Sequence, residues 1–503
     1  MHLLGAAHFF RQLLFFERVL KIVTSYKSKD KAPTSRRVAA SLLAFAFAAI
    51  AYSAQSGAQS LSVPNPATPT AQSYQGSVPV GEATSQPIDL SLDDAIQRGL
   101  RTNLGVILSS TQTQAARGQR LTDLQALLPT VDFKAQENLA QVDLPAEGLR
   151  IPGFPKIIGP FGYTDIRASL TWSLFDVASM RHYLAAKHNF AAAKLSAQDA
   201  RDLVILTVGN AYLLVLADDA SVTTAQAQVD TSKSSLDQAS ANHQAGIAPL
   251  LDELRARVDY QSQQQQLIAA QNSLAKDKLA LARTVGLPLA QLFNLSDRAP
   301  YAAFDQIDVD AAIKQAHANR KDLAAMLEQT RAAELERKAA TADRLPTFTV
   351  NADYGDIGVN VAHSHGTGDA SGAISAPIFK EFALRGEAQT AQAQLDVARA
   401  QSSDKSAQVD ADVRDALLDI QSAQKLVEVA QSSVSLANEE LKEAQERYAN
   451  GVSDNLSVSQ AQQSVAQANN QYVASLYRHN VAKLSLARAL GAGASYKNYL
   501  GGK

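Results

Sequence analysis

The sequence predicts an α+β membrane protein in which long helical hairpins continue from strands that cross a membrane. Three observations lead to this fold class: an internal repeat, helices too long for a compact domain, and strands with one apolar and one polar face. The composition agrees, since 46% of residues are hydrophobic but only 6% are aromatic. This mixture suits helices packed through small side chains better than a core filled with large rings.

Charge and cysteine content exclude several classes of function. A formal net charge of −2 offers no electrostatic attraction for nucleic acid. The chain has no cysteine, which excludes disulfides, thiol catalysis, cysteine-based metal sites and a lipidated cysteine. Attachment to a membrane must therefore come from the polypeptide itself.

The N-terminal region has the parts of an export signal in their usual order. An arginine pair at 36–37 precedes an apolar run at 38–51 that ends in small residues suited to cleavage. The run is too short for a spanning helix, although a plain membrane anchor is the alternative. Residues 1–54 are therefore predicted to be a signal peptide with a long n-region. Residues 55–87, rich in Ser, Pro, Ala, Gln and Thr, are predicted to be a flexible linker.

A long internal repeat divides the remaining chain into two halves. Residues 92–96 match residues 309–313 at an offset of 217, and residues 282–286 match residues 487–491 at an offset of 205. A period near 200 residues is too long for a solenoid unit, so it indicates a duplicated half-protein. Each half is predicted to contain a helix, two strands and a long helical hairpin. The predicted boundaries are a first repeat at 88–290, a connector at 291–308 and a second repeat at 309–503.

Unbroken heptads predict the two hairpins. Residues 387–450 contain neither Gly nor Pro, and residues 181–245 contain a single Gly. At ~1.5 Å per residue such a helix is roughly 100 Å long, which no compact domain can bury. An apolar stretch at 203–216 is the nearest approach to a membrane helix, but its polar residues favour burial in the helical bundle. In the second half, large apolar residues recur every seven positions with alanine three residues later: Val413, Ile420, Val427, Val434, Leu441 and Tyr448 alternate with Ala416, Ala423, Ala430, Ala437 and Ala444.

Alternating residues predict the strands. Apolar and polar residues alternate strictly over 166–174, and a similar alternation begins at 348–354 and ends at 374–378. The loops between the paired strands are expected at 145–163 and 363–369. A soluble two-sheet sandwich is the alternative, but export and about ten residues per strand favour a transmembrane barrel. Four strands cannot close a barrel, so several chains must share one.

The chain resembles the TolC-like outer-membrane efflux proteins over nearly everything after residue 88. The resemblance rests on the duplicated halves, on two similar strand endings and on the two helix turns. The strand endings are Ser173-Leu174-Phe175-Asp176 and Ala376-Pro377-Ile378-Phe379. The second turn, Arg447-Tyr448-Ala449-Asn450-Gly451 followed by Leu456 and Ala461-Gln462, is similar to the family's R-Y-x-x-G…L…A-Q pattern, and residues 242–246 followed by Leu251-Asp252-Glu253-Leu254 form its partner. The duplication of these short motifs in a fixed register makes the signal specific.

The resemblance implies a homotrimer in which three chains give four strands each to a 12-stranded outer-membrane β-barrel. The barrel would continue into a periplasmic tunnel of α-helical coiled coils. The implied location is the outer membrane, with a periplasmic domain, and the implied contacts are outer-membrane lipid, a periplasmic adaptor (membrane fusion protein) and an inner-membrane pump. The chain would be a passive conduit for small molecules or proteins in a tripartite efflux or type I secretion system, without a cofactor or enzymatic activity.

Two other classes of protein stay open. A secreted periplasmic coiled-coil adaptor or structural protein would not need strands with a lipid-facing side. A hydrolase or lyase would need a cluster of titratable residues, and the sequence contains no P-loop, nucleophile elbow or H-E-x-x-H motif. His363 and His365 could bind a metal, but two histidines in a polar loop are more often solvated. No catalytic or metal site is predicted.

The resemblance also implies a periplasmic gate at the helix turns. It places Gly246 and Gly451 at the periplasmic mouth, and it places Tyr448 and Asp252 where the family pairs a tyrosine with an aspartate. A hydrogen bond between the phenol and the carboxylate is therefore expected to hold the tips inward.

Three positions at the gate depart from the family pattern. The arginine expected two residues after the second glycine is Ser453, and the aspartates that commonly ring the constriction are Ser457 and Gln460. We therefore expect a mouth that is held by fewer bonds and is less acidic, with weaker selectivity for cations.

Overall fold

The computed structural model describes residues 69–150, 152–297, 301–304, 307–450, 452–453 and 455–500. The chain divides into two units, Met1–Asn65 and Pro66–Lys503, and all described residues belong to the second. The signal peptide predicted at 1–54 lies outside the described residues.

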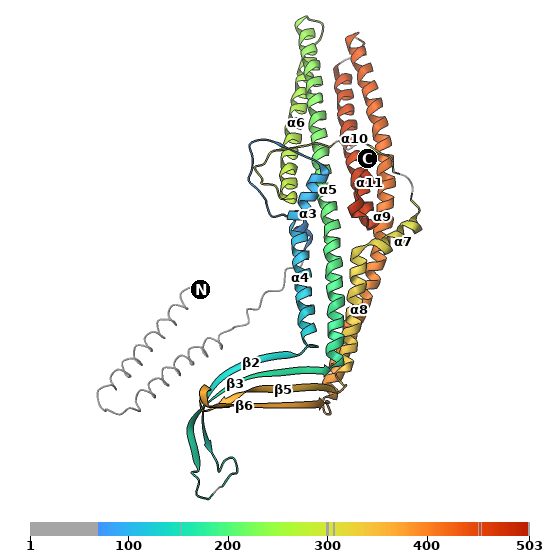
Figure 1. Cartoon of the computed structure of the whole chain (residues 1–503). Helices are drawn as coiled ribbons and strands as arrows, with labels where there is room; N and C mark the ends of the chain where they lie inside the picture. The colour runs from blue at the N-terminus through green and yellow to red at the C-terminus, as the bar shows by residue number, and fades with distance from the viewer. Residues whose placement is uncertain are drawn as a thin grey trace, which may run out of the picture. The chain divides into compact units, whose positions relative to one another are not determined.

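Each half of the chain supplies two helices, two strands and a long helical hairpin in the same order (Figure 1). The four strands lie at one end of these elements and the hairpin turns at the other. The first half contains α3 (Leu92–Thr102), α4 (Leu104–Gln125), β2 (Thr130–Asp143), β3 (Ile157–Phe175), α5 (Val177–Gln244) and α6 (Leu250–Val285). The second half contains α7 (Val309–Asn319), α8 (Lys321–Ala342), β5 (Thr347–Gly358), β6 (Ser364–Ser375), α9 (Glu381–Ala449) and α10 (Asn455–Ala489). Short elements complete the fold: η2 (Ala71–Gln75), β1 (Ile88–Leu90), β4 (Phe293–Leu295), η3 (Val361–His363), η4 (Gly493–Ser495) and α11 (Lys497–Leu500).

The duplication extends to individual hydrogen bonds. Thr113 Oγ1 on α4 donates to the carbonyl of Ala193 on α5 at 3.1 Å, and Thr330 Oγ1 on α8 donates to the carbonyl of Ala398 on α9 at 3.3 Å. The two threonines are 217 residues apart and the two alanines 205, which are the two offsets of the sequence repeat. The halves therefore fold alike and can be compared position by position.

A break between two helices recurs in both halves but is stabilised differently. Asn103 separates α3 from α4 and Arg320 separates α7 from α8, each with an extended backbone. The Asn103 side chain caps α4 by accepting from the Gly105 N–H at 2.9 Å. Buried Arg320 instead donates to two carboxylates, Asp322 at 2.7 Å and Asp412 at 2.6 Å.

The described part of the predicted flexible linker is hydrogen-bonded to the helices, which differs from the expectation. The Val78 N–H donates to the Thr102 carbonyl at 2.9 Å and the Val80 N–H to the Gly286 carbonyl at 3.1 Å. Tyr74 packs against the core, and β1 pairs in parallel with β4 in the predicted connector. Irregular backbone bonds of this kind leave no period in the sequence, so composition alone suggested a free linker.

The four strands form one antiparallel sheet in the order β2-β3-β5-β6. Leu170 lies opposite Val131 and Ala352 on one face, whereas the preceding residue, Ser169, lies opposite two aspartates on the other. Val131 and Phe133 are 66% and 73% exposed, as expected of a face that meets lipid. The outer edges of β2 and β6 have no partner strand within the described chain. Backbone groups cannot stay unpaired in lipid, so the sheet must continue onto another chain.

The strands are longer and the loops shorter than predicted. β3 begins at Ile157, and β6 covers most of the loop expected at 363–369, while residues 376 and 378 lie beyond its end. Glycine-rich β6 has low strand propensity, but the Tyr354 ring packs over it. A Cβ added at Gly368 would lie 3.1 Å from that ring. Cross-strand packing therefore supplies what the residues of β6 lack.

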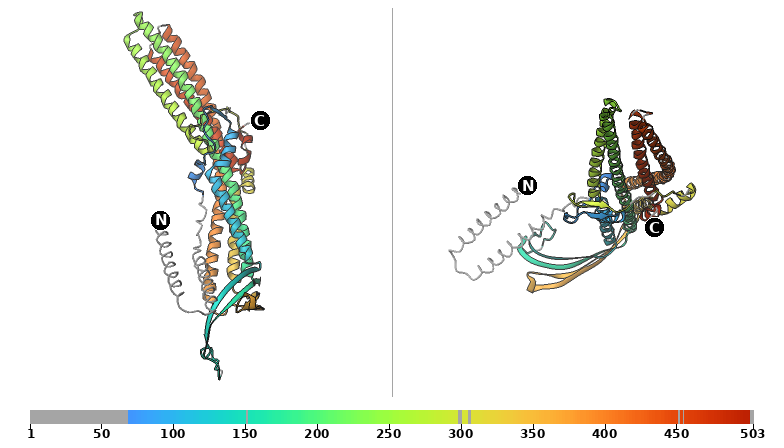
Figure 2. Two further views of the ribbon diagram at one scale, coloured as in Figure 1. Left: turned by 60° about the vertical axis from the view of Figure 1, so that its left-hand side comes forward. Right: turned by 90° about the horizontal axis from the view of Figure 1, so that it is seen from above.

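The hairpin helices pack side by side as a wall (Figure 2). α5 packs against α6 on one side and α10 on the other, and α10 packs in turn against α9. Among the described residues only α5 has a stretch long and apolar enough to cross a membrane. Its residues Val204, Val208 and Tyr212 instead belong to a buried core with Leu281 and Leu484. Burial of the 203–216 stretch in the bundle is thus confirmed.

Candidate functional site

The residues predicted to form the gate lie at the ends of the two hairpins. Gly246 follows α5 with φ = 71°, a left-handed conformation that glycine adopts without strain. Asp252 lies buried in the first turn of α6, and Tyr448 lies at the end of α9. Gly451 lies outside the described residues.

The expected bond between Tyr448 and Asp252 is not formed within the chain. The Tyr448 hydroxyl is buried and has no hydrogen-bond partner among the described residues. Its surroundings are hydroxyl and amide side chains of α5, including Ser235 and Gln238. The Asp252 carboxylate instead lies 3.9 Å from Arg255 on its own helix. The heptad seam packs Tyr448 against Val458 and Ala461 of α10, whereas Asp252 is on α6, and this geometry separates the two groups.

Two amide side chains join the hairpins near their tips. Asn455 Nδ2 on α10 donates to the backbone carbonyl of Asp252 at 3.3 Å, and Gln462 Nε2 donates to Ser235 Oγ at 2.7 Å. Gln462 was located in the sequence as part of the turn motif but without this role, and Asn455 was missed because an isolated Asn carries no motif. The position of Asn455 at the start of the return helix, just after the turn, was the available signal.

The two positions that lack the family's aspartates are neutral at the tip of α10. Ser457 Oγ accepts a hydrogen bond from Ser453 Oγ at 3.0 Å, and Gln460 is exposed. Asp454, the carboxylate nearest to these two positions in the sequence, lies outside the described residues.

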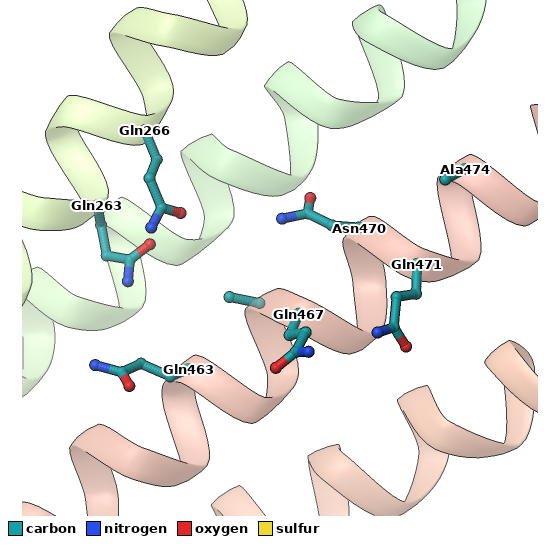
Figure 3. A pocket seen from close by; sticks show the side chains of 8 residues that line it. Gln263, Gln266, Gln463, Gln467, Asn470, Gln471 and Ala474 are labelled. Carbon is teal, nitrogen blue, oxygen red and sulfur yellow. The ribbon is translucent and has the colours of Figure 1, made fainter.

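An amide-lined groove lies between α6 and α10 (Figure 3). Gln263 is buried, and its Oε1 has no partner among the described residues. No titratable side chain lines this groove, so it contains no group for acid–base or nucleophilic chemistry. Its lining residues are Gln263, Gln266, Gln463, Ala466, Gln467, Asn470, Gln471 and Ala474.

The described residues contain no group of three or more metal-ligating side chains. His363 Nδ1 lies 2.9 Å from Asn360 Oδ1, and His365 is exposed on β6. The polar face of the sheet carries ion pairs: Arg167 lies 2.8 Å from the Asp165 carboxylate and 2.6 Å from that of Asp353.

Partly buried acids lie within the helical wall, on α5 well before its tip. Burial first, and then neighbouring Asp277, raises the pKa of Asp218 to about 7. Burial also raises the pKa of Asp199 to about 6, although Arg488 Nη2 lies 2.5 Å from its carboxylate and opposes the shift. Asp199 is on α5 and Arg488 on α10, so this ion pair joins the two halves.

A family model described as outer membrane efflux protein matches residues 109–287 and 312–492. The chain belongs to this family. The two matched segments fall in the two halves, and together they cover most of the chain. Family members form trimeric channels that work in efflux systems.

One curated relative of the chain is the pyoverdine export outer membrane protein OpmQ of Pseudomonas putida. The two are 25% identical over 305 residues, which cover 60% of this chain and 64% of OpmQ. The match thus spans slightly less than two thirds of that relative.

Solved structures show the same fold. A membrane protein from Pseudomonas aeruginosa superposes with a TM-score of 0.72 at 19% identity, covering 82% of this chain and 95% of that one. The outer membrane protein VceC of Vibrio cholerae gives 0.70 at 22% identity, covering 80% and 96%. The predicted fold class, a barrel joined to a helical tunnel, and the outer-membrane location are confirmed.

Proposed function

We propose that this chain is the outer-membrane channel subunit of a tripartite efflux or type I secretion system. Three copies would form the conduit, passing cargo outward without chemistry of their own. One observation carries the proposal: a four-stranded sheet with an apolar face and two open edges continues directly into helices of 68 and 69 residues. A secreted coiled-coil adaptor, the alternative, has no use for a lipid-facing sheet.

The proposed partners are a periplasmic adaptor and an inner-membrane pump, since a passive duct needs an energy source elsewhere. The OpmQ name mentions pyoverdine export, so a small exported metabolite is the first class of cargo to test. The absence of an enzymatic role is also a proposal, supported by the neutral groove between α6 and α10.

Conductance in planar lipid bilayers tests the conduit. Protein extracted from outer membranes with detergent should insert and give stable unitary ion currents. A matched control is the Val427→Pro variant, in which the helical wall is interrupted. Protein that stays in the soluble fraction and gives no currents would overturn the proposal.

We further propose that Gly246, Asp252, Tyr448, Gly451, Ser457 and Gln460 form the periplasmic gate. Because Ser457 and Gln460 are neutral, a trivalent cation added on the periplasmic side should block the wild-type current weakly. The Ser457→Asp and Gln460→Asp variants should gain block, since each adds a threefold ring of carboxylates. Strong block of the wild type, unchanged in these variants, would contradict the assignment.

A further inference from the structure

The internal repeat predicts how one chain meets the next. Within a chain, α5 of the first half packs against α10 of the second. The offset of 205 makes α9 the counterpart of α5, and α6 the counterpart of α10. α6 and α9 are the two flanks of the helical wall, and α5 and α10 stand between them (Figure 2). The flank of α9 therefore corresponds to a surface that already has a partner inside the chain.

We infer that Asp404 binds Arg283 of the partner subunit where the flanks of two neighbouring chains meet. This inference rests on the proposed trimer and specifies which surfaces and residues meet in it. Three contacts between α5 and α10, each shifted by 205 residues, carry the argument.

The first contact is an ion pair. Arg488 Nη2 on α10 lies 2.5 Å from Asp199 Oδ1 on α5, and both side chains are largely buried. The shifted positions are Arg283 on α6 and Asp404 on α9, which retain both residue types. Arg283 and Asp404 are exposed, and neither forms an ion pair with another described residue. The same pair of charges thus occurs twice, once joined and once on opposite flanks.

The second contact is polar. Gln462 on α10 donates to Ser235 on α5 at 2.7 Å. The shifted positions are Arg257 on α6 and Glu440 on α9, which carry opposite charges and are exposed. Arg257 lies 2.7 Å from Glu253 on its own helix and has further donors to offer. Charge complementarity between the two flanks therefore holds at two separate heights of the wall.

The third contact is apolar. Leu484 on α10 and Leu213 on α5 share one core and are 2% and 4% exposed. Their counterparts, Leu279 on α6 and Leu418 on α9, are 50% and 64% exposed. Contact between the two flanks would remove both from water, the driving force of most associations.

One difference between the two interfaces also follows. Leu484 approaches Gly209 on α5 closely, since a Cβ there would lie 2.7 Å from Leu484 Cδ1. The counterpart of Gly209 on α9 is Arg414, whose side chain leaves no such space. Leu279 of the partner subunit therefore packs less deeply than Leu484 does.

The two contacting flanks differ from each other, so the interface is heterologous. Copies joined by such an interface leave no flank unpaired only when they close into a ring. Within one chain α5 and α10 stand between the two flanks. The occupant of each flank is therefore a second copy.

Cysteine crosslinking tests the pair directly, because the chain has no cysteine of its own. Detergent-extracted protein with Arg283→Cys and Asp404→Cys, treated with a short bismaleimide, should yield covalent dimers and trimers on denaturing gels. Arg488→Cys with Asp199→Cys should crosslink within the chain and stay at the monomer mass. Arg283→Cys with Glu439→Cys is the negative control, because residue 439 lies 35 positions beyond residue 404 along α9, roughly 50 Å at ~1.5 Å per residue.

Charge reversal provides a second measurement. Asp404→Arg alone should lower the trimer fraction in detergent, and adding Arg283→Asp should restore it. Monomers alone from the Arg283→Cys and Asp404→Cys protein, in a sample whose uncrosslinked form is trimeric, would overturn the inference and leave the conduit intact. A wild type that is itself monomeric would overturn the proposed function.

Discussion

Arg320 shows at the scale of one residue how the duplicated halves diverged. It occupies the position of Asn103 and is buried between Asp322 and Asp412. Burial would raise the pKa of Asp322, but the hydrogen bonds and charge of Arg320 outweigh it and hold that pKa at about 2. Arg320 therefore stabilises the break between α7 and α8 with ion pairs, whereas Asn103 stabilises the break between α3 and α4 by capping a helix.

Replacing Arg320 with alanine should lower the free energy of unfolding by about 3 kcal/mol, because it removes the nearest cationic partner of the largely buried Asp322 carboxylate. Urea unfolding in detergent, followed by circular dichroism, measures the change. The control is Arg331→Ala, which removes a largely exposed arginine paired with Glu328 and should cost about 0 to 1 kcal/mol. Equal losses in the two variants would contradict this account of Arg320.

The neighbouring carboxyl groups of Asp218 and Asp277 should make the stability of the folded chain depend on pH. Their counterparts in the second half are Ala423 and Ala482, both buried, so two carboxyls stand where the other hairpin has two methyl groups. The pKa of Asp218 is raised in the folded chain from 3.8 to about 7. The folded state therefore binds more protons than the unfolded state between these values, and stability should fall as pH rises from about 4 to about 7.

The double variant Asp218→Ala with Asp277→Ala should flatten this slope, and thermal unfolding at several pH values measures it. Some slope should remain, because Asp199 titrates in the same direction with its pKa raised to about 6. Asp219→Ala, at an exposed neighbour, is the control and should keep the full slope. A double variant with the wild-type slope would show that the pair does not carry the effect.

At the scale of single elements, α9 is the clearest case of a helix set by its sequence. Val413, Ile420 and Val427 of its predicted seam are buried, because a seven-residue repeat keeps one face turned toward α10. Proline at Val427 should cost about 3 kcal/mol or more, since it removes a backbone hydrogen bond and clashes with the preceding turn.

The yield of trimer from detergent extracts measures the effect of Val427→Pro. Val427→Ala is the matched control, because it removes the same side chain but keeps the helix, and it should retain most of the trimer. Wild-type yield from the proline variant would contradict the continuous helical wall.

An element could be predicted from the sequence when its own residues determine it, and could not when it depends on contacts with distant residues. Heptads and alternation are local periods, so the hairpins and the centre of β3 could be located from sequence alone. β6 could not be bounded, because its glycines depend on Tyr354 from the neighbouring strand. The backbone bonds of the predicted linker join Val78 to Thr102 and Val80 to Gly286, and no local period reports such non-local pairs.

The arrangement of the residues proposed for the gate was only partly predictable for a similar reason. The turn glycine Gly246 and the neutral residues Ser457 and Gln460 could be located because they follow motifs. The missing Tyr448–Asp252 bond could not be predicted, because the surroundings of the Tyr448 hydroxyl depend on how the two hairpins pack through α5 and α10. The recurrence of Arg283 as Arg488 and of Asp404 as Asp199 was visible in the sequence, but only the observed ion pair gives it meaning.

At the scale of the whole molecule, both the sheet and the helical wall have surfaces that lack a partner within one chain. The sheet has two open edges, and the helical wall has two flanks with exposed apolar residues such as Leu279 and Leu418. A closed ring of copies satisfies both at once, since the strands then pair around a barrel and the flanks pair around a tunnel. Four strands in each of three chains give the barrel of twelve expected for this family.

The mass of the detergent-extracted particle tests this account most directly. Protein solubilised from outer membranes should give, by native mass spectrometry, a single species of three chains that persists on dilution. A stable monomer in detergent, or recovery of the folded chain from the soluble fraction, would contradict the shared barrel and with it the conduit.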